Sequence, residues 1–101
     1  MRLEYDEHFG KIIPPERIDL TTAEEFKEAL QTLYERGYST VVIDCSRLAI
    51  IDSAGLGNLI MFQKKLQERG GELRITNVDH RYIRHLFDMI ELDRVIKIEE
   101  G

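Results

Sequence analysis

The stretch that decides the fold is Val41-Val42-Ile43-Asp44-Cys45-Ser46-Arg47-Leu48-Ala49-Ile50-Ile51-Asp52-Ser53-Ala54-Gly55-Leu56-Gly57. It begins with an apolar, β-branched run, which is typical of a buried strand. It ends with Ser53 between Asp52 and Ala54, where an amphipathic helix is predicted to begin. The pattern therefore predicts a strand, a turn and a helix, with the Ser53 hydroxyl at a helix N-terminus that favours anionic groups such as phosphate.

Strand-like and helix-like segments alternate on both sides of this stretch. Residues 3–9 and 11–13 indicate two strands, the second stopped by Pro14-Pro15. A helix follows, capped by Thr21 or Thr22 with a glutamate three residues on, as in a capping box, and Gly37 fits its end. Residues 40–45 show no alternation, so we expect a central strand covered on both faces.

The C-terminal half continues the same alternation. We expect a helix over 54–69, a strand over 72–76, a helix capped by Asp79, and a last strand over 95–98. The buried set expected for the third helix is Ile83, Leu86, Phe87 and Ile90. Together the segments predict a single α/β domain over 1–101, with a mixed sheet of four to five strands packed with three to four α-helices.

Composition narrows the class of protein. The 101 residues suit one domain, and 33% charged residues with 43% hydrophobic residues suit a globular chain. A net charge of −5 without a basic cluster disfavours nucleic-acid binding. Neither a membrane-spanning run nor a signal peptide is evident, and the lone Cys45 fits a reducing cytoplasm.

Two features of the second helix concern its surface. A helical wheel places Leu56, Leu59, Ile60, Gln63 and Leu66 on one side, with Phe62 at the margin. Met61 falls on the opposite side with Asn58 and Lys65, where it is either a plain exposed methionine or a contact for a partner. Gly55 and Gly57 either weaken the first turns or let a partner backbone or a nucleotide approach closely.

Residue type alone leaves the role of Ser53 open. Ser53 or Asp52 could simply cap the helix. Asp19, Asp44 and Asp52 could form a catalytic or metal site, but no base, nucleophile and orienting group stand together. His8, His80 and His85 lack metal-ligand spacing with Cys45, so solvated or capping histidines are the better interpretation.

The motifs carry a resemblance to a known family. Asp52-Ser53-Ala54-Gly55-Leu56-Gly57, preceded by Val42-Ile43-Asp44, resembles the signature of STAS domains, most closely that of bacterial anti-sigma factor antagonists (anti-anti-sigma factors). Ile18-Asp19-Leu20-Thr21-Thr22-Ala23-Glu24-Glu25 resembles the acidic turn before the family's first helix. The segments Ile83-Arg84-His85-Leu86-Phe87 and Glu91-Leu92-Asp93-Arg94-Val95 resemble its C-terminal helix and final strand. The chain departs from the family at Pro14-Pro15-Glu16-Arg17, which stands where a glycine is common.

The resemblance implies a regulatory binding module rather than an enzyme. Unphosphorylated, such a protein binds an anti-sigma factor serine kinase and frees a sigma factor, which activates transcription. The kinase phosphorylates Ser53 with its own ATP and Mg²⁺, and a phosphatase resets the protein, so no cofactor is expected here. The implied partner-binding residues are Asp19, Thr21, Asp52, Ala54, Gly55, Asn58 and Met61, on a monomer in the cytoplasm.

Three other classes stay open at this point. The chain could be a scaffold or sensor subunit of another signalling complex, or a small nucleotide-binding or phosphate-hydrolysing protein that uses the helix mouth. It could also be a domain of an anion transporter, an alternative that a chain beginning with its own Met1 disfavours.

Overall fold

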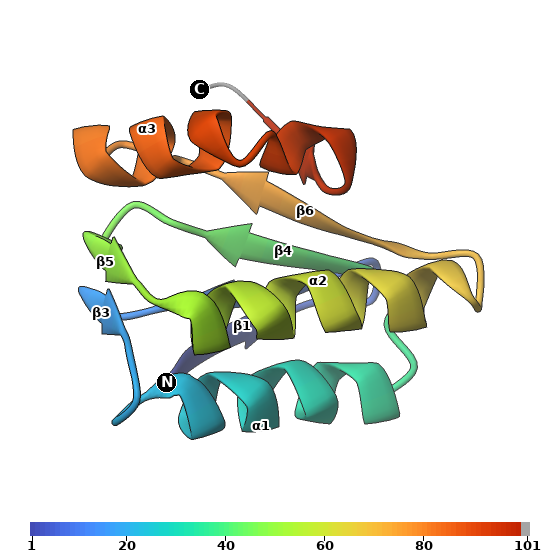
Figure 1. The fold of residues 1–101 in the computed structure, drawn as a ribbon. Helices are drawn as coiled ribbons and strands as arrows, with labels where there is room; N and C mark the ends of the chain where they lie inside the picture. The colour runs from blue at the N-terminus through green and yellow to red at the C-terminus, as the bar shows by residue number, and fades with distance from the viewer. Residues whose placement is uncertain (100–101) are drawn as a thin grey trace.

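In the computed structural model, which describes residues 1–99, a five-stranded mixed sheet forms the centre of the protein (Figure 1). Its strands, in the order β1-β2-β4-β6-β7, are β1 (Arg2–Tyr5), β2 (Gly10–Ile13), β4 (Thr40–Asp44), β6 (Glu72–Thr76) and β7 (Lys97–Ile98). β1 runs antiparallel to β2, and the other neighbours pair in parallel. The edge strand therefore comes from a hairpin, and the rest of the sheet from crossovers.

Each crossover between parallel strands contains a helix. Within residues 1–99 these are α1 (Ala23–Glu35), α2 (Ser53–Gln67) and α3 (Arg81–Met89), the last followed by the short 3₁₀ helix η1 (Leu92–Arg94). Crossovers are right-handed in nearly all proteins, so strands that succeed one another in order across a sheet place their helices on one face. Figure 1 shows α1 and α2 side by side against the sheet. The predicted fold class is confirmed.

The central strand β4 is buried on one face only. Val41 and Ile43 are each 1% exposed, whereas Val42 between them is half-buried. The register places Val42 beside Lys11 on β2 and Arg74 on β6, so charged side chains share its face. The expectation of a strand covered on both faces is therefore wrong, because the apolar content of one strand does not reveal what its neighbours contribute to that face.

Two very short strands, which the sequence did not predict, form a second small sheet. β3 (Arg17–Ile18) pairs in parallel with β5 (Ile50–Ile51). The backbone oxygen of Glu16 accepts hydrogen bonds from the backbone N–H groups of Ala49 and Ile50, at 2.8 and 3.0 Å. This sheet fastens the loop after β2 to the loop after β4.

The helix starts differ from the predicted ones. Thr22 precedes α1, but its side chain caps nothing. The Thr22 hydroxyl instead accepts from the backbone N–H of Asp19 and donates to the backbone oxygen of Arg17, so no capping box forms. At α3 the cap is His80, whose Nδ1 accepts from the N–H of Tyr82, rather than Asp79. The expectation of a capping histidine is met there.

Two predicted core positions are exposed. Ile60 on α2 is 45% exposed and Ile90 after α3 is 42% exposed. Phe62, predicted at the margin of the α2 stripe, is 1% exposed and packs edge-on against Tyr34 of α1, with ring centroids 6.4 Å apart. Because α2 packs against α1 through Phe62, its buried face includes Phe62 and leaves Ile60 exposed. Gly37 does end α1 as expected, with a φ of +90° that favours glycine.

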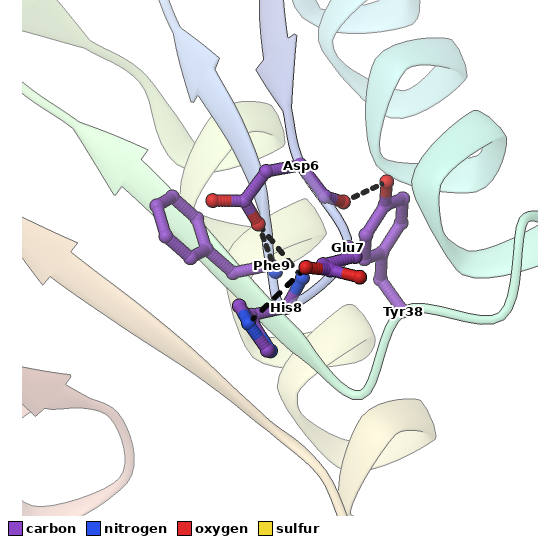
Figure 2. Close-up of polar contacts among 5 residues, drawn as sticks. All are labelled: Asp6, Glu7, His8, Phe9 and Tyr38. Atoms are coloured by element: carbon purple, nitrogen blue, oxygen red, sulfur yellow. Dashed lines mark hydrogen bonds and ion pairs between the residues drawn. The ribbon is translucent and has the colours of Figure 1, made fainter.

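The hairpin between β1 and β2 shortens the first predicted strand (Figure 2). The Asp6 carboxylate accepts hydrogen bonds from the backbone N–H groups of His8 and Phe9, at 2.7 and 3.0 Å, and these bonds lower the pKa of Asp6. The Tyr38 hydroxyl donates to the backbone oxygen of Asp6. Residues 6–9 therefore form a side-chain-supported turn, where one strand over 3–9 was expected.

Candidate functional site

The small β3–β5 sheet brings the acidic turn beside the start of α2. Ile18 pairs with Ile51, and the backbone N–H of Asp52 donates to the oxygen of Ile18 at 3.0 Å. Asp19 and Asp52, the next residues on the two strands, therefore leave the sheet as neighbours. The structure thus brings together two segments that are more than thirty residues apart, at the carboxyl end of the strands where α/β folds commonly bind ligands.

Ser53 is the first residue of α2 and is exposed. The cap is its neighbour: a carboxylate oxygen of Asp52 accepts from the N–H of Gly55 at 3.1 Å. Within residues 1–99 the Ser53 hydroxyl has no hydrogen-bond partner. The two roles that the sequence left open are thereby separated, with Asp52 closing the helix end and Ser53 offering its hydroxyl to solvent.

A network of hydrogen bonds holds the acidic turn in one conformation. The Asp19 carboxylate accepts from the backbone N–H and the hydroxyl of Thr21, at 3.0 and 2.7 Å. These bonds, that of the hydroxyl first, hold the pKa of Asp19 below its ordinary value. The backbone oxygen of Asp19 also accepts from the N–H groups of Thr22 and Ala23. Leu20, at the tip of this turn, is left 87% exposed.

The two glycines of the motif have different surroundings. A Cβ on Gly55 would lie 2.6 Å from Cγ2 of Ile18 and 2.8 Å from Cγ1 of Ile51, so α2 packs on the small sheet only because this side chain is missing. A Cβ on Gly57 would meet nothing within 4 Å. Gly55 therefore lets the start of α2 pack closely on the small sheet, which fixes the position of Ser53. That Gly55 also contacts a partner stays a prediction.

Asn58 and Met61 lie further along α2. The Asn58 amide donates to the backbone oxygen of Ala23 at 3.1 Å, which ties the start of α1 to α2. Met61, about one turn later, is 40% exposed. Ala54 is also exposed, beside Ser53. The predicted site residues therefore lie on α2 from its cap to Met61 and on the acidic turn beside its start.

The third candidate acid, Asp44, and Cys45 have structural roles. Burial raises the pKa of Asp44, but hydrogen bonds from Ser46 and Asn77 outweigh it and lower that pKa overall. Burial raises the pKa of Cys45 to about 12, so its thiol is unreactive at neutral pH. In the part of the chain from 1 to 99, no three His, Cys, Asp or Glu side chains are grouped so that they could hold a metal ion.

A shallow hollow of about 460 Å³ lies at the same edge of the molecule, lined by Glu16, Ala49, Ile50, His80 and Tyr82. Its walls come from the loops after β2, β4 and β6, from β5 and from the start of α3. Among the described residues, no helix is both long enough and apolar enough to cross a membrane.

Three features of this region escaped the sequence analysis. Leu20 lies in the acidic turn, but no local pattern indicates that its side chain is exposed. The Thr22 hydroxyl bridges Asp19 and Arg17, where a helix cap was predicted. The strand pairing of Ile18 with Ile51 was not predicted either, although each isoleucine precedes an aspartate, a repeat that could have indicated it.

Comparisons with known proteins agree with this geometry. A family model of the STAS domain matches residues 4–101. An anti-sigma-B factor antagonist from Listeria monocytogenes is 33% identical over 82 residues, which cover 81% of this chain and 71% of the relative. One from Staphylococcus epidermidis is 30% identical over 84 residues, covering 83% and 77% of the two chains.

Solved structures share the fold. The crystal structure of an anti-sigma factor antagonist from Mycobacterium paratuberculosis superposes with a TM-score of 0.84 at 21% identity, over 96% of this chain and 81% of that one. The phosphorylated form of the Bacillus cell fate determinant SpoIIAA does so with a TM-score of 0.77 at 19% identity, over 99% and 89%. The chain therefore belongs to the STAS domain family and, within it, to the anti-sigma factor antagonists.

Proposed function

We propose that this protein is a binding module switched by phosphorylation of Ser53. Unphosphorylated, it binds an anti-sigma factor serine kinase and so releases a sigma factor to activate transcription. Phosphorylation ends this binding, and a phosphatase restores it. The observation that carries the proposal is the exposed Ser53 hydroxyl, which no described residue binds, at the start of α2 and beside the acidic turn.

The position of Ser53 suits a group that is added and removed. Phosphate carries about −1.5 to −2 charges and three acceptor oxygens. The dipole of α2 would favour it by about 0.3–1 kcal/mol, and the Asp52 carboxylate next to it would oppose it by a similar small amount. The effect within the fold is then small. At an interface shaped for a neutral hydroxyl, repulsion and desolvation cost more, which makes phosphate a switch of binding.

The chemistry of transfer belongs to the partner in this proposal. Anti-sigma factor antagonists are regulatory binding proteins rather than enzymes. The kinase supplies the base, ATP and Mg²⁺, while this chain supplies only the hydroxyl, with no cofactor of its own. We further propose that it acts as a monomer in the cytoplasm, where such a kinase and its sigma factor would meet it. Asp19, Thr21, Asp52, Ala54, Asn58 and Met61 flank the hydroxyl as partner contacts.

Phosphorylation by the kinase tests the proposal directly. The protein is incubated with ATP and the purified anti-sigma factor kinase of the same genome, and modified peptides are identified by mass spectrometry. We expect one phosphate, on Ser53, and none on the Ser53→Ala variant. Phosphate on Thr21 or Ser46 in place of Ser53 would contradict the assignment.

A second incubation separates this proposal from an enzymatic function. With ATP but without the kinase, we expect neither phosphoprotein nor released phosphate. Unaided turnover of ATP would instead favour a nucleotide-hydrolysing protein that uses the mouth of α2.

A further inference from the structure

We propose that Leu20 is the apolar anchor through which this protein recognises its anti-sigma factor. The partner receives the Leu20 side chain in an apolar pocket, while its own chain crosses α2 at Gly57. This inference rests on the proposed function and adds to it the residues that determine the choice of partner.

The acidic turn displays Leu20 rather than merely leaving it exposed. Leu20 is 87% exposed, more than any other large hydrophobic residue within 1–99. The turn around it is held by the two bonds of the Asp19 carboxylate to Thr21 and by the two bonds of the Thr22 hydroxyl. A side chain presented on a preorganised turn loses little conformational entropy on binding, which is what an anchor requires.

The exposed face of α2 beside this turn has the composition of an interface core. It consists of Ser53, Ala54, Gly57, Ile60 and Met61. No charged residue occurs from Ser53 to Gln63, although 33% of the chain is charged. Depletion of charged residues and the presence of an exposed methionine are two features of the core of a protein–protein interface. The turn that carries Leu20 lies beside the start of this face, because it follows β3, and β3 pairs with β5 just before α2.

Gly57 adds a feature that the fold itself does not use. A Cβ at Gly55 would collide with Ile18 and Ile51, and Gly37 and Gly70 have positive φ angles, so the structure requires glycine at these three positions. Gly57 has an ordinary helical conformation and open space around it. Glycine weakens a helix at such a position. A partner whose backbone approaches α2 closely accounts for the missing side chain.

The anti-sigma factor is the occupant that this surface favours. Ser53 belongs to the same exposed face of α2 as Gly57, and the turn that carries Leu20 lies beside it. A phosphate on Ser53 would therefore lie inside the buried contact, so phosphorylation would release the partner. Other exposed hydrophobic residues lie on other elements, because Met89 is the last residue of α3 and Val95 follows η1. The partner is thus a protein with an apolar pocket, and its contact excludes water around Ser53.

Calorimetric titration with the purified kinase that phosphorylates Ser53 tests the inference. We expect Leu20→Ala and Gly57→Ala each to weaken binding at least tenfold, or about 1.4 kcal/mol. Leu20→Met, which keeps the volume and the apolar character, should retain most of the affinity. Met89→Ala, 65% exposed in the wild type, and Gln67→Ala at the end of α2 are the matched controls and should bind as the wild type does.

Thermal unfolding of the same variants excludes a merely structural effect. Leu20→Ala should melt as the wild type does, and Gly57→Ala should melt at a higher temperature while binding less well. Binding of Leu20→Ala within twofold of the wild type would overturn the anchor and leave the proposed function intact. Failure of the wild type to bind the kinase would overturn the proposed function itself. A wild-type dimer that Leu20→Ala converts to a monomer would assign the surface to a second copy instead.

Discussion

At the scale of single residues, Asp52 and Ser53 divide the work at the start of α2. The Asp52 carboxylate accepts the hydrogen bond of the Gly55 N–H, while the Ser53 hydroxyl bonds to no described residue. Asp52→Ala should therefore lower the free energy of unfolding by about 1 kcal/mol, the usual cost of a lost cap. Ser53→Ala should change it by less than about 0.5 kcal/mol. Urea denaturation measures both, and an equal loss in the two variants would show that Ser53 also caps the helix.

Asp44 gives the fold a dependence on acid. Hydrogen bonds from Ser46 and Asn77 outweigh its burial and hold the pKa of Asp44 below the ordinary 3.8. A carboxylate with a lowered pKa stabilises the folded state above its unfolded pKa, and this contribution disappears as the pH falls through its folded pKa. The free energy of unfolding should thus decline below pH 3.8. Urea denaturation over a series of pH values should show a shallower decline in Asp44→Asn than in the wild type.

At the scale of elements, Gly55 joins α2 to the β3–β5 sheet. A methyl group there would lie within 3 Å of both Ile18 and Ile51, which are buried and cannot move freely. Gly55→Ala should destabilise the protein by about 1–3 kcal/mol, the usual cost of overpacking, despite the better helix propensity of alanine. The midpoint of urea denaturation checks this expectation. A gain in stability would show that α2 can lift from the sheet at no cost.

The elements that the sequence predicted well are those with a long local pattern. The strand at Thr40–Asp44 and the helix at Ser53–Gln67 each carry their own signal, an apolar run or a helical period. β3 and β5 have two residues each, too few for any period, and exist only because the loops meet. The choice of His80 over Asp79 as a cap, and of Phe62 over Ile60 as a core residue, likewise depends on packing against distant elements.

The residues of the candidate site also divide into those with a local sequence signal and those whose role depends on distant parts of the chain. Ser53 and Asp52 were predictable, because their motif lies within one continuous stretch. The roles of Gly55 and Gly57 were not, since only the position of Ile18 and Ile51 shows which glycine is enclosed. Leu20 could not be distinguished from a core leucine, because the hydrogen bonds that display it come from the folded turn.

At the scale of the whole molecule, the core and the site occupy separate regions. The buried residues form one cluster between the sheet and its helices, including Phe26 of α1, Phe62 of α2 and Phe87 of α3. Ser53 is the exposed first residue of α2, and its hydroxyl takes part in none of the hydrogen bonds of the sheet. A charge placed there meets solvent and the acidic turn rather than the core.

Phosphorylation should therefore change the surface of this protein and leave its backbone in place. The helix dipole favours the added charge and Asp52 opposes it, so the folded state should gain or lose little. Backbone amide spectra of the two forms should differ at the acidic turn around Asp19 and at the start of α2. Ser53→Asp should reproduce only part of these shifts, because a carboxylate carries less charge and fewer acceptors than a phosphate. Shifts spread through β4 and α3 would mean instead that phosphate acts by rearranging the fold.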